Sequence, residues 1–153
     1  MANLTYAEMA EALRVTLGAA TAISTSEAVG SLSDGFEDLP KLRVYPQRGE
    51  TDSMQGNAPR TTFRSGIRVS DTVFSVDVIC HQRANVDEDM TETLATLDSV
   101  EAVLIAQKTK PFFGEQRILD FWWSWEIVSF SQGQGDSAIP YLGFRISVTL
   151  KAA

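Results

Sequence analysis

The side chains with the most versatile chemistry in this chain are one histidine and one cysteine. His81 and Cys80 are the only residues of their kinds, so a multi-histidine metal site and a disulfide within the chain are both excluded. The two are adjacent in a segment that alternates like a strand, which predicts side chains on opposite faces. A Cys–His nucleophilic pair needs both groups within hydrogen-bonding reach. We therefore expect Cys80 to be a small core residue.

Acidic side chains cluster once along the chain, at Asp87, Glu88, Asp89 and Glu92. Such a cluster could bind a metal ion or act in acid–base catalysis, but its spacing does not match that of a calcium loop. The residues stand where a helix is expected to begin, and the helix dipole stabilises anions there. The position therefore explains the cluster without a metal ion.

Two further patterns lack the geometry that chemistry needs. Asp77 and His81 are four residues apart on one expected strand face, too far to pair directly. The glycines of segment 132–135 follow a strand but precede no helix, and a dinucleotide-binding loop needs both. We therefore predict no catalytic residue, no metal and no cofactor.

Length and composition indicate a globular protein with a real core. The chain has 153 residues, of which 44% are apolar and 22% charged. These values exclude a collagen-like or intrinsically disordered chain and predict a single domain over 1–153. The first residues lack the basic start and apolar run of a signal peptide, and no apolar run reaches the roughly 18 residues that span a bilayer. We expect a soluble protein made inside the cell.

Charge is unevenly distributed along the chain. The net charge is −7 overall, made up of −5 over 1–40, +4 over 41–70, −7 over 71–107 and +1 over 108–153. The acidic total is unfavourable for a general nucleic-acid binder, which needs clustered Lys and Arg. Segregated charge is typical of a subunit whose basic part meets an acidic part of its neighbour. A mixed, solvated surface is the alternative.

Two helices are expected. Thr5 and Glu8 have the spacing of a capping box, and the apolar residues that follow recur with helical period: Tyr6, Met9, Ala10, Leu13, Leu17 and Ala20. A second helix is expected over about 86–107, with Asn85 or Asp87 as its N-cap and Pro111 beyond its end. Its expected buried stripe is Met90, Leu94, Leu97, Val100 and Leu104.

The middle of the chain predicts strands around a long loop. Segment 39–46 alternates, and Pro46 is expected to end it. Segment 47–60 is polar and rich in glycine, which predicts a loop of a length that is usually functional or mobile. Two extended runs follow, over 61–70 and 72–81. Ser70 and Asp71 form either a tight hairpin turn or a bulge in one long strand.

The last third predicts two strands, which we expect to pair antiparallel. Apolar residues alternate over 119–127 and again over 142–150, the pattern of half-buried strands. The expected fold class is α+β: a mostly antiparallel sheet of about four to five strands with two helices packed on one face.

Several aromatic residues are candidates for contact with other proteins. In segment 121–125 we expect Trp123 and Trp125 on the core face and Trp122 on the polar face. A tryptophan on a polar strand face is a candidate anchor for a partner, although a loop of the same chain could cover it. Phe112 and Phe113, between a proline and a glycine, raise the same question of what covers them.

The order of these segments resembles that of the tail terminator (tail completion) proteins of long-tailed bacteriophages and related tail-like particles. The resemblance rests on the N-terminal amphipathic helix, the 39–44 strand, the long loop and Arg68-Val69. It continues through the 74–78 strand, the acidic helix that ends at 98–104, and the closing strand pair. It covers almost the whole chain and is one of segment order and size.

The resemblance implies a structural protein without catalysis or cofactor. Such proteins form a hexameric ring that caps the head-proximal end of the tail tube, halts its polymerisation and joins the head–tail connector. The implied partners are copies of the chain, the tail tube protein and the connector or head-closure protein. DNA would pass through the lumen without sequence-specific recognition. The implied location is the tail or neck of the virion, after synthesis in the host cytoplasm.

Charge and aromatic patterns select the candidate interface residues for such a ring: Arg43, Arg48, Arg60, Arg64, Arg68, Asp87, Glu88, Asp89, Phe112, Phe113 and Trp122. Two alternatives remain. The first is another neck, head-closure or tube component, although two strong helices are unfavourable for a tube subunit. The second is a small-molecule-binding or enzymatic α+β domain with Asp77, His81 and exposed aromatics around a pocket.

Overall fold

The fold is a five-stranded sheet with two helices, as the computed structural model shows for residues 3–33, 35–51, 69–132 and 138–153. The elements, in chain order, are α1 (Tyr6–Gly18), β1 (Thr25–Ala28), β2 (Lys41–Thr51), β3 (Ser70–Gln82), α3 (Val86–Ala106), the 3-10 turn η1 (Phe112–Gly114), β4 (Ile118–Gln132) and β5 (Ile139–Ala152).

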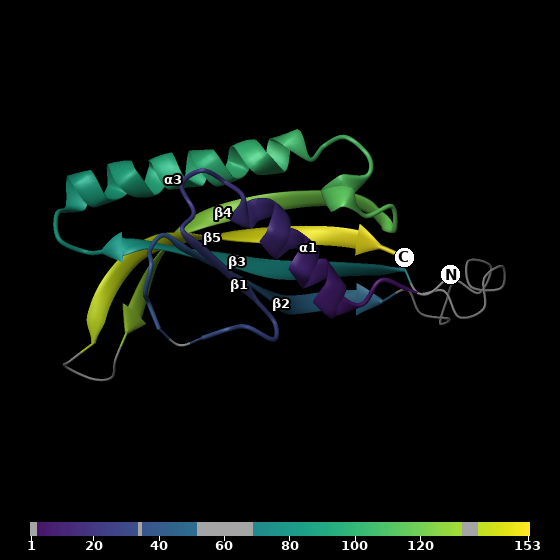
Figure 1. The fold of residues 1–153 in the computed structure, drawn as a ribbon, viewed down its shortest axis with the longest axis horizontal. Coiled ribbons are helices and arrows are strands. Elements are labelled where there is room, and N and C mark those ends of the chain that lie inside the picture. Colours follow the sequence, from purple (N-terminus) through teal and green to yellow (C-terminus); the bar gives the residue numbers. More distant parts are fainter. Residues whose placement is uncertain (1–2, 34, 52–68, 133–137) are drawn as a thin grey trace.

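The sheet has the strand order β1-β2-β3-β5-β4 and is mostly antiparallel. Only β1 and β2 run parallel, while β4 and β5 form the antiparallel pair that the sequence predicts. Both helices belong to one layer, in which α1 crosses the strands and α3 runs along them (Figure 1). The predicted α+β class is confirmed.

Local capping interactions define where both helices begin. The Thr5 hydroxyl accepts the Glu8 N–H and the Glu8 carboxylate accepts the Thr5 N–H, which confirms the capping box. Of the two candidates for the cap of α3, the structure selects Asn85, whose side chain accepts the N–H groups of Asp87 and Glu88. These bonds satisfy amides that have no partner within the helix.

One apolar cluster lies between the helices and the sheet. Met9, Leu13 and Leu17 of α1 pack with Leu97 and Val100 of α3 over a single face of the strands. The strand residues of this cluster alternate along each strand: Leu42, Val44, Phe74, Val76, Val78, Phe144, Ile146, Val148 and Leu150. Each side chain of this size contributes roughly 1.5–3 kcal/mol on full burial, so this face stabilises the fold.

The first half of α3 differs from the predicted stripe. Leu94 is 40% exposed, whereas Thr93 and Thr96 are buried against the sheet. The helix therefore turns a polar side toward the end of β3. Thr93 and Thr96 tolerate this position because their hydroxyls donate to the carbonyls of Asp89 and Glu92 one turn earlier.

The first two strands differ from the sequence prediction. Pro46 does not end its strand, because β2 continues to Thr51 and the ladder shifts register between Pro46 and Arg48. A bulge tolerates a residue that lacks an N–H. The predicted 47–60 loop is therefore wrong over 47–51, and its remainder lies outside the described residues. β1 was not expected, since its four residues are too few to alternate.

Neither the hairpin turn nor the bulge that the sequence predicts at 70–71 is present, since both ladders keep a regular register there. Ser70 and Asp71 both pair with β2 and β5, so β3 begins there and no hairpin turn interrupts it. Most of the predicted 61–70 run lies outside the described residues.

A second bulge, at the other end of β3, depends on a glycine. The pairing of β3 with β5 shifts between Ile79 and His81, and Gly143 of β5 faces this irregularity. A Cβ atom on Gly143 would lie 2.0 Å from the Val78 carbonyl oxygen and 2.9 Å from the Phe130 ring. Only glycine allows the two backbones to approach this closely.

We therefore expect Gly143→Ala to lower the free energy of unfolding by about 1–3 kcal/mol, the usual cost of overpacking. Urea unfolding followed by tryptophan fluorescence would measure it. Gly35→Ala is the matched control, because its Cβ would meet nothing nearer than 3.7 Å, and it should leave the stability unchanged. Equal stability of the two variants would contradict this interpretation.

Candidate protein interaction surface

The face of the sheet opposite the helices presents residues in rows that cross four strands. One row is charged and alternates in sign: Arg43, Asp77, Arg145 and Glu126. The next carries four hydroxyl groups, on Tyr45, Ser75, Ser147 and Ser124. The third is Arg48, Val73, Thr149 and Trp122. We call this the open face, because neither helix packs on it.

Asp77 is the centre of the charged row. Its carboxylate accepts two hydrogen bonds from Arg145, at 2.7 and 3.2 Å, one from Tyr45 at 2.6 Å and one from Ser75 at 2.9 Å. Asp77 is only 6% exposed although no helix covers it, since the long side chains of its neighbours surround it. Its hydrogen bonds from Arg145 raise the pKa of that guanidinium. The row is therefore a preformed, rigid part of the open face.

Asp77 and His81 lie on opposite faces of β3. Asp77 faces the open side, whereas His81 contacts α3 beyond the bulge of β3, with Nε2 3.1 Å from the Asp89 carbonyl oxygen and 3.4 Å from the Thr93 hydroxyl. The prediction that Asp77 and His81 share one strand face is wrong. An active site that combines them is not supported by this geometry.

The bulge also overturns the prediction that Cys80 and His81 lie on opposite faces of the strand. Cys80 and His81 do not lie on opposite faces: both side chains meet α3, where Thr93 and Thr96 lie beside the thiol. Burial raises the pKa of the Cys80 thiol to about 11, so it stays protonated near neutral pH and is a poor nucleophile. Cys80 is a core residue, as its type predicts.

One end of the open face is covered by the segment that connects β1 and β2. Lys41 pairs with Glu27 at 2.7 Å and donates to the Gly35 carbonyl at 2.8 Å. Arg43 donates to the carbonyls of Ser33 and Gly35, and its guanidinium lies over the Phe36 ring. Arg43, a candidate interface residue, is thus occupied within its own chain.

The uncovered end holds a groove between Arg48 and Trp122. Two adjoining hollows of about 340 and 470 Å³ share Arg48, Val73, Trp122 and Thr149 as walls and floor. Arg48 and Trp122 come from β2 and β4, three strand spacings apart, or about 14 Å. The fold therefore brings together two predicted interface residues that are 74 positions apart in the sequence.

The polar groups around this groove are available to a partner. Trp122 is 46% exposed, and among the described residues neither its indole N–H nor the Arg48 guanidinium has a hydrogen-bond or ion-pair partner. A carboxylate oxygen of Asp71 at the same groove is buried and unpartnered. Burying a polar atom without a hydrogen bond costs free energy, so a partner that bonds these groups gains stability.

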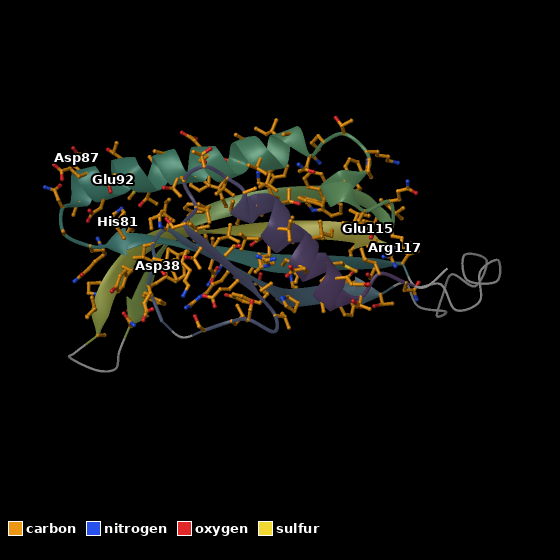
Figure 2. All side chains as sticks on the ribbon, viewed as in Figure 1. Asp38, His81, Asp87, Glu92, Glu115 and Arg117 are labelled. Carbon is orange, nitrogen blue, oxygen red and sulfur yellow. The ribbon has the colours of Figure 1, made fainter. Side chains whose placement is uncertain are left out.

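The acidic start of α3 divides into two parts. Asp87 and Glu88 are exposed, and Figure 2 shows Asp87 at the tip of the helix with Glu92 and His81 nearby. Asp89 is 8% exposed, and its carboxylate accepts the N–H groups of Ala84 and Asn85. Asp89 therefore holds the turn before α3, while Asp87 and Glu88 stay free for contact.

The remaining candidates are not all at the surface. Phe112 and Phe113 are buried, with their rings 5.4 and 4.7 Å from the ring of Phe121, so the expectation that they are exposed is wrong. Conversely Trp125, predicted in the core, is 48% exposed. Arg60, Arg64 and Arg68 lie outside the described residues.

The described residues were also compared with the requirements of a metal site and of a membrane span, and the sequence with known proteins. Within 3–33, 35–51, 69–132 and 138–153, no three His, Cys, Asp or Glu residues gather closely enough to hold a metal ion. None of the helices described is long and apolar enough to cross a membrane. The sequence matches no model of a known protein family, and a comparison with curated proteins finds no significant match.

We expect Asp77→Ala to destabilise the protein by about 1–3 kcal/mol, because Arg145, Tyr45 and Ser75 lose their shared acceptor. Chemical unfolding followed by circular dichroism would measure the change. Glu126→Gln is the control, since Glu126 is 4.0 Å from Arg145 and 66% exposed, and a surface pair contributes little. Unchanged stability of Asp77→Ala would show that the charged row does not stabilise the fold.

Proposed function

We propose that this protein is a structural assembly protein of the phage tail terminator type. Its copies form a ring, a hexamer, at the head-proximal end of the tail tube, where the ring stops tube polymerisation and joins the head–tail connector. The observation that carries the proposal is the open face, with the half-exposed Trp122 and the unpaired Arg48 at one groove. Tryptophan and arginine are the residues most enriched at the energetic centres of protein interfaces.

A ring needs two different patches on each subunit, one of which meets the other patch on the next copy. The groove is the first patch and lies beside Asp71 and Val73, near the start of β3. The acidic tip of α3, with Asp87 and Glu88, is the second and follows the end of β3. The two patches lie in different layers and at opposite ends of that strand, so a contact between them joins copies head to tail.

The charges of the two patches support this contact, but with fewer basic residues than the sequence predicts. Lys41 and Arg43 are bound within the chain, so Arg48 is the basic residue of the described part of 41–70 that remains free. In the proposed contact, Arg48 and the Trp122 indole N–H donate to Asp87 and Glu88 of the next copy. Charge-assisted hydrogen bonds of this kind are stronger than neutral ones.

Another neck component or a tube subunit would also form rings, but with different neighbours. The position of the protein in the particle therefore distinguishes a terminator from these alternatives. Antibody-gold labelling of tails from the phage or tail-like particle that encodes the chain should place it at the head-proximal end only. Labelling along the whole tube would indicate a tube subunit. Absence of label from particles would overturn the assembly proposal.

Arg48→Glu should prevent ring formation, because it places an acid opposite Asp87 and Glu88 of the neighbour. Mass photometry and negative-stain microscopy would follow rings of the purified protein, or rings on added tail ends where these are needed. The designed rescue combines Arg48→Glu with Asp87→Lys and Glu88→Lys in one chain, which restores opposite charges.

Lys110→Glu, a charge change beyond the opposite end of α3 and outside both patches, is the matched control and should assemble normally. Rings formed by Arg48→Glu at the wild-type concentration would exclude the groove as a ring contact. Loss of rings without rescue by the triple variant would exclude the acidic tip as its partner.

A further inference from the structure

The two edge strands of the sheet differ in how many backbone N–H and C=O groups they leave without a partner strand. β1 forms one edge and has four residues, and both backbone groups of Ala28 are bonded by Ser31. β4 forms the other edge and has 15 residues. A long open edge can pair with another strand, whereas a short edge is protected.

Hydrogen bonds at Phe121 show which backbone groups of β4 point outward. The Phe121 N–H donates to the Asp120 carboxylate and its carbonyl accepts from the Lys108 ammonium group, so neither pairs with β5. In an antiparallel strand, outward groups recur at every second residue. The outward groups beyond Phe121 therefore belong to Trp123, Trp125, Ile127 and Ser129, and no other described residue bonds them.

The side chains along this edge lack the usual protection against pairing. Trp122 is 46% exposed on the open face and Trp125 is 48% exposed on the helix face. From Phe121 to Gln132 there is no proline and no lysine, and Glu126 is the only charged residue. Monomeric sheets typically protect such an edge with lysine, proline or a covering loop, so this edge is suited to a partner strand.

We propose that two copies of the chain pair through β4 as antiparallel strands related by a two-fold axis, which joins two five-stranded sheets into one of ten strands. A second copy is the occupant that the edges favour. β4 of another copy offers an open edge of equal length, whereas β1 does not. A two-fold contact also closes on itself, because the same surface is used by both copies.

The charges along β4 select the register. Centring the pair on Trp123 places Asp120 opposite Glu126, and centring it on Glu126 places two glutamates opposite each other, both of which are destabilising. Centring it on Ser124 places the already bonded backbone groups of Phe121 in two of the four pairs of outward residues, whereas centring it on Trp125 pairs the free groups of Trp123, Trp125 and Ile127. With Trp125 on the axis, Glu126 faces Ser124 and Trp122 faces Val128 of the other copy. This register covers both exposed tryptophans and opposes no like charges.

The proposal is independent of the terminator function, since it concerns the purified chain alone and its centre is Trp125. Edge pairing occupies neither Arg48 nor the acidic tip of α3, but it shares Trp122 with the ring contact, so the two contacts compete for that side chain. Trp122 borders both surfaces, and the groove continues toward the two-fold seam.

Single-cysteine variants test the register directly. Cys80 is buried, so an introduced cysteine is the reactive thiol of the chain. A mixture of Ser124→Cys and Glu126→Cys chains should form a disulfide-linked heterodimer on mild oxidation, because these residues face each other. Ala102→Cys, exposed on α3, is the control and should not cross-link. Equal cross-linking of the control, or none by the mixture, would overturn the proposal.

Sedimentation equilibrium tests the pairing without cross-linking. Wild type should dimerise reversibly, and Trp125→Lys should raise the dimer Kd by at least about tenfold, because two lysines would meet at the axis. Leu119→Lys is the matched control, as Leu119 is 41% exposed on β4 but precedes the bonded Phe121. It should leave the Kd unchanged.

The outcomes separate the two proposals. A wild-type protein that stays monomeric at concentrations on the order of 100 µM, or an equal effect of both lysine variants, would overturn edge pairing and leave the terminator proposal intact. A cross-linked dimer together with absence of the chain from tails would do the reverse. Where Trp125→Lys does not fold, the cysteine mixture decides.

Discussion

Both helices pack on the same face of the sheet, and the properties of the other surfaces follow from this arrangement. The apolar residues of β2, β3 and β5 alternate toward α1 and α3 and form one cluster. No second helical layer is available for the opposite face in the described chain. That face must therefore be stable in contact with water or with another protein. The same limit leaves β4 as a long edge without a covering element.

The open face is stable because its polar groups bond each other across strands. Asp77 of β3 is buried by the neighbours that hydrogen-bond with it. Its carboxylate accepts from Arg145 of β5 and from Tyr45 of β2, so one side chain links three strands. The segment that connects β1 and β2 is attached in a similar way, through Lys41 and Arg43. At the groove, one carboxylate oxygen of Asp71 is buried and has no hydrogen-bond partner among the described residues.

The groups with the greatest chemical versatility serve the packing of α3. Cys80 and His81 meet the threonines and Asp89 of that helix, and burial keeps the thiol protonated. The surfaces that remain available are instead suited to contact: the groove with Arg48 and Trp122, the acidic tip of α3 and the β4 edge. Association with copies and stacked partners is the function that we propose for these surfaces.

The sequence by itself determined the α+β class, the capping box at Thr5, the helix over 86–107 and the final strand pair, because each depends on local spacing and on periodic burial. It misplaced Pro46 and the Cys80–His81 pair, since bulges change which face a residue meets without altering the local pattern. It assigned Trp125 to the correct face, but the position of β4 at the edge of the sheet leaves that side chain half exposed. Only the tertiary structure decided that Arg48 and Trp122 share a groove, that Arg43 is bound internally, and that β4 is an edge. Those properties depend on which strands become neighbours, and contacts between distant segments have no period in a single chain.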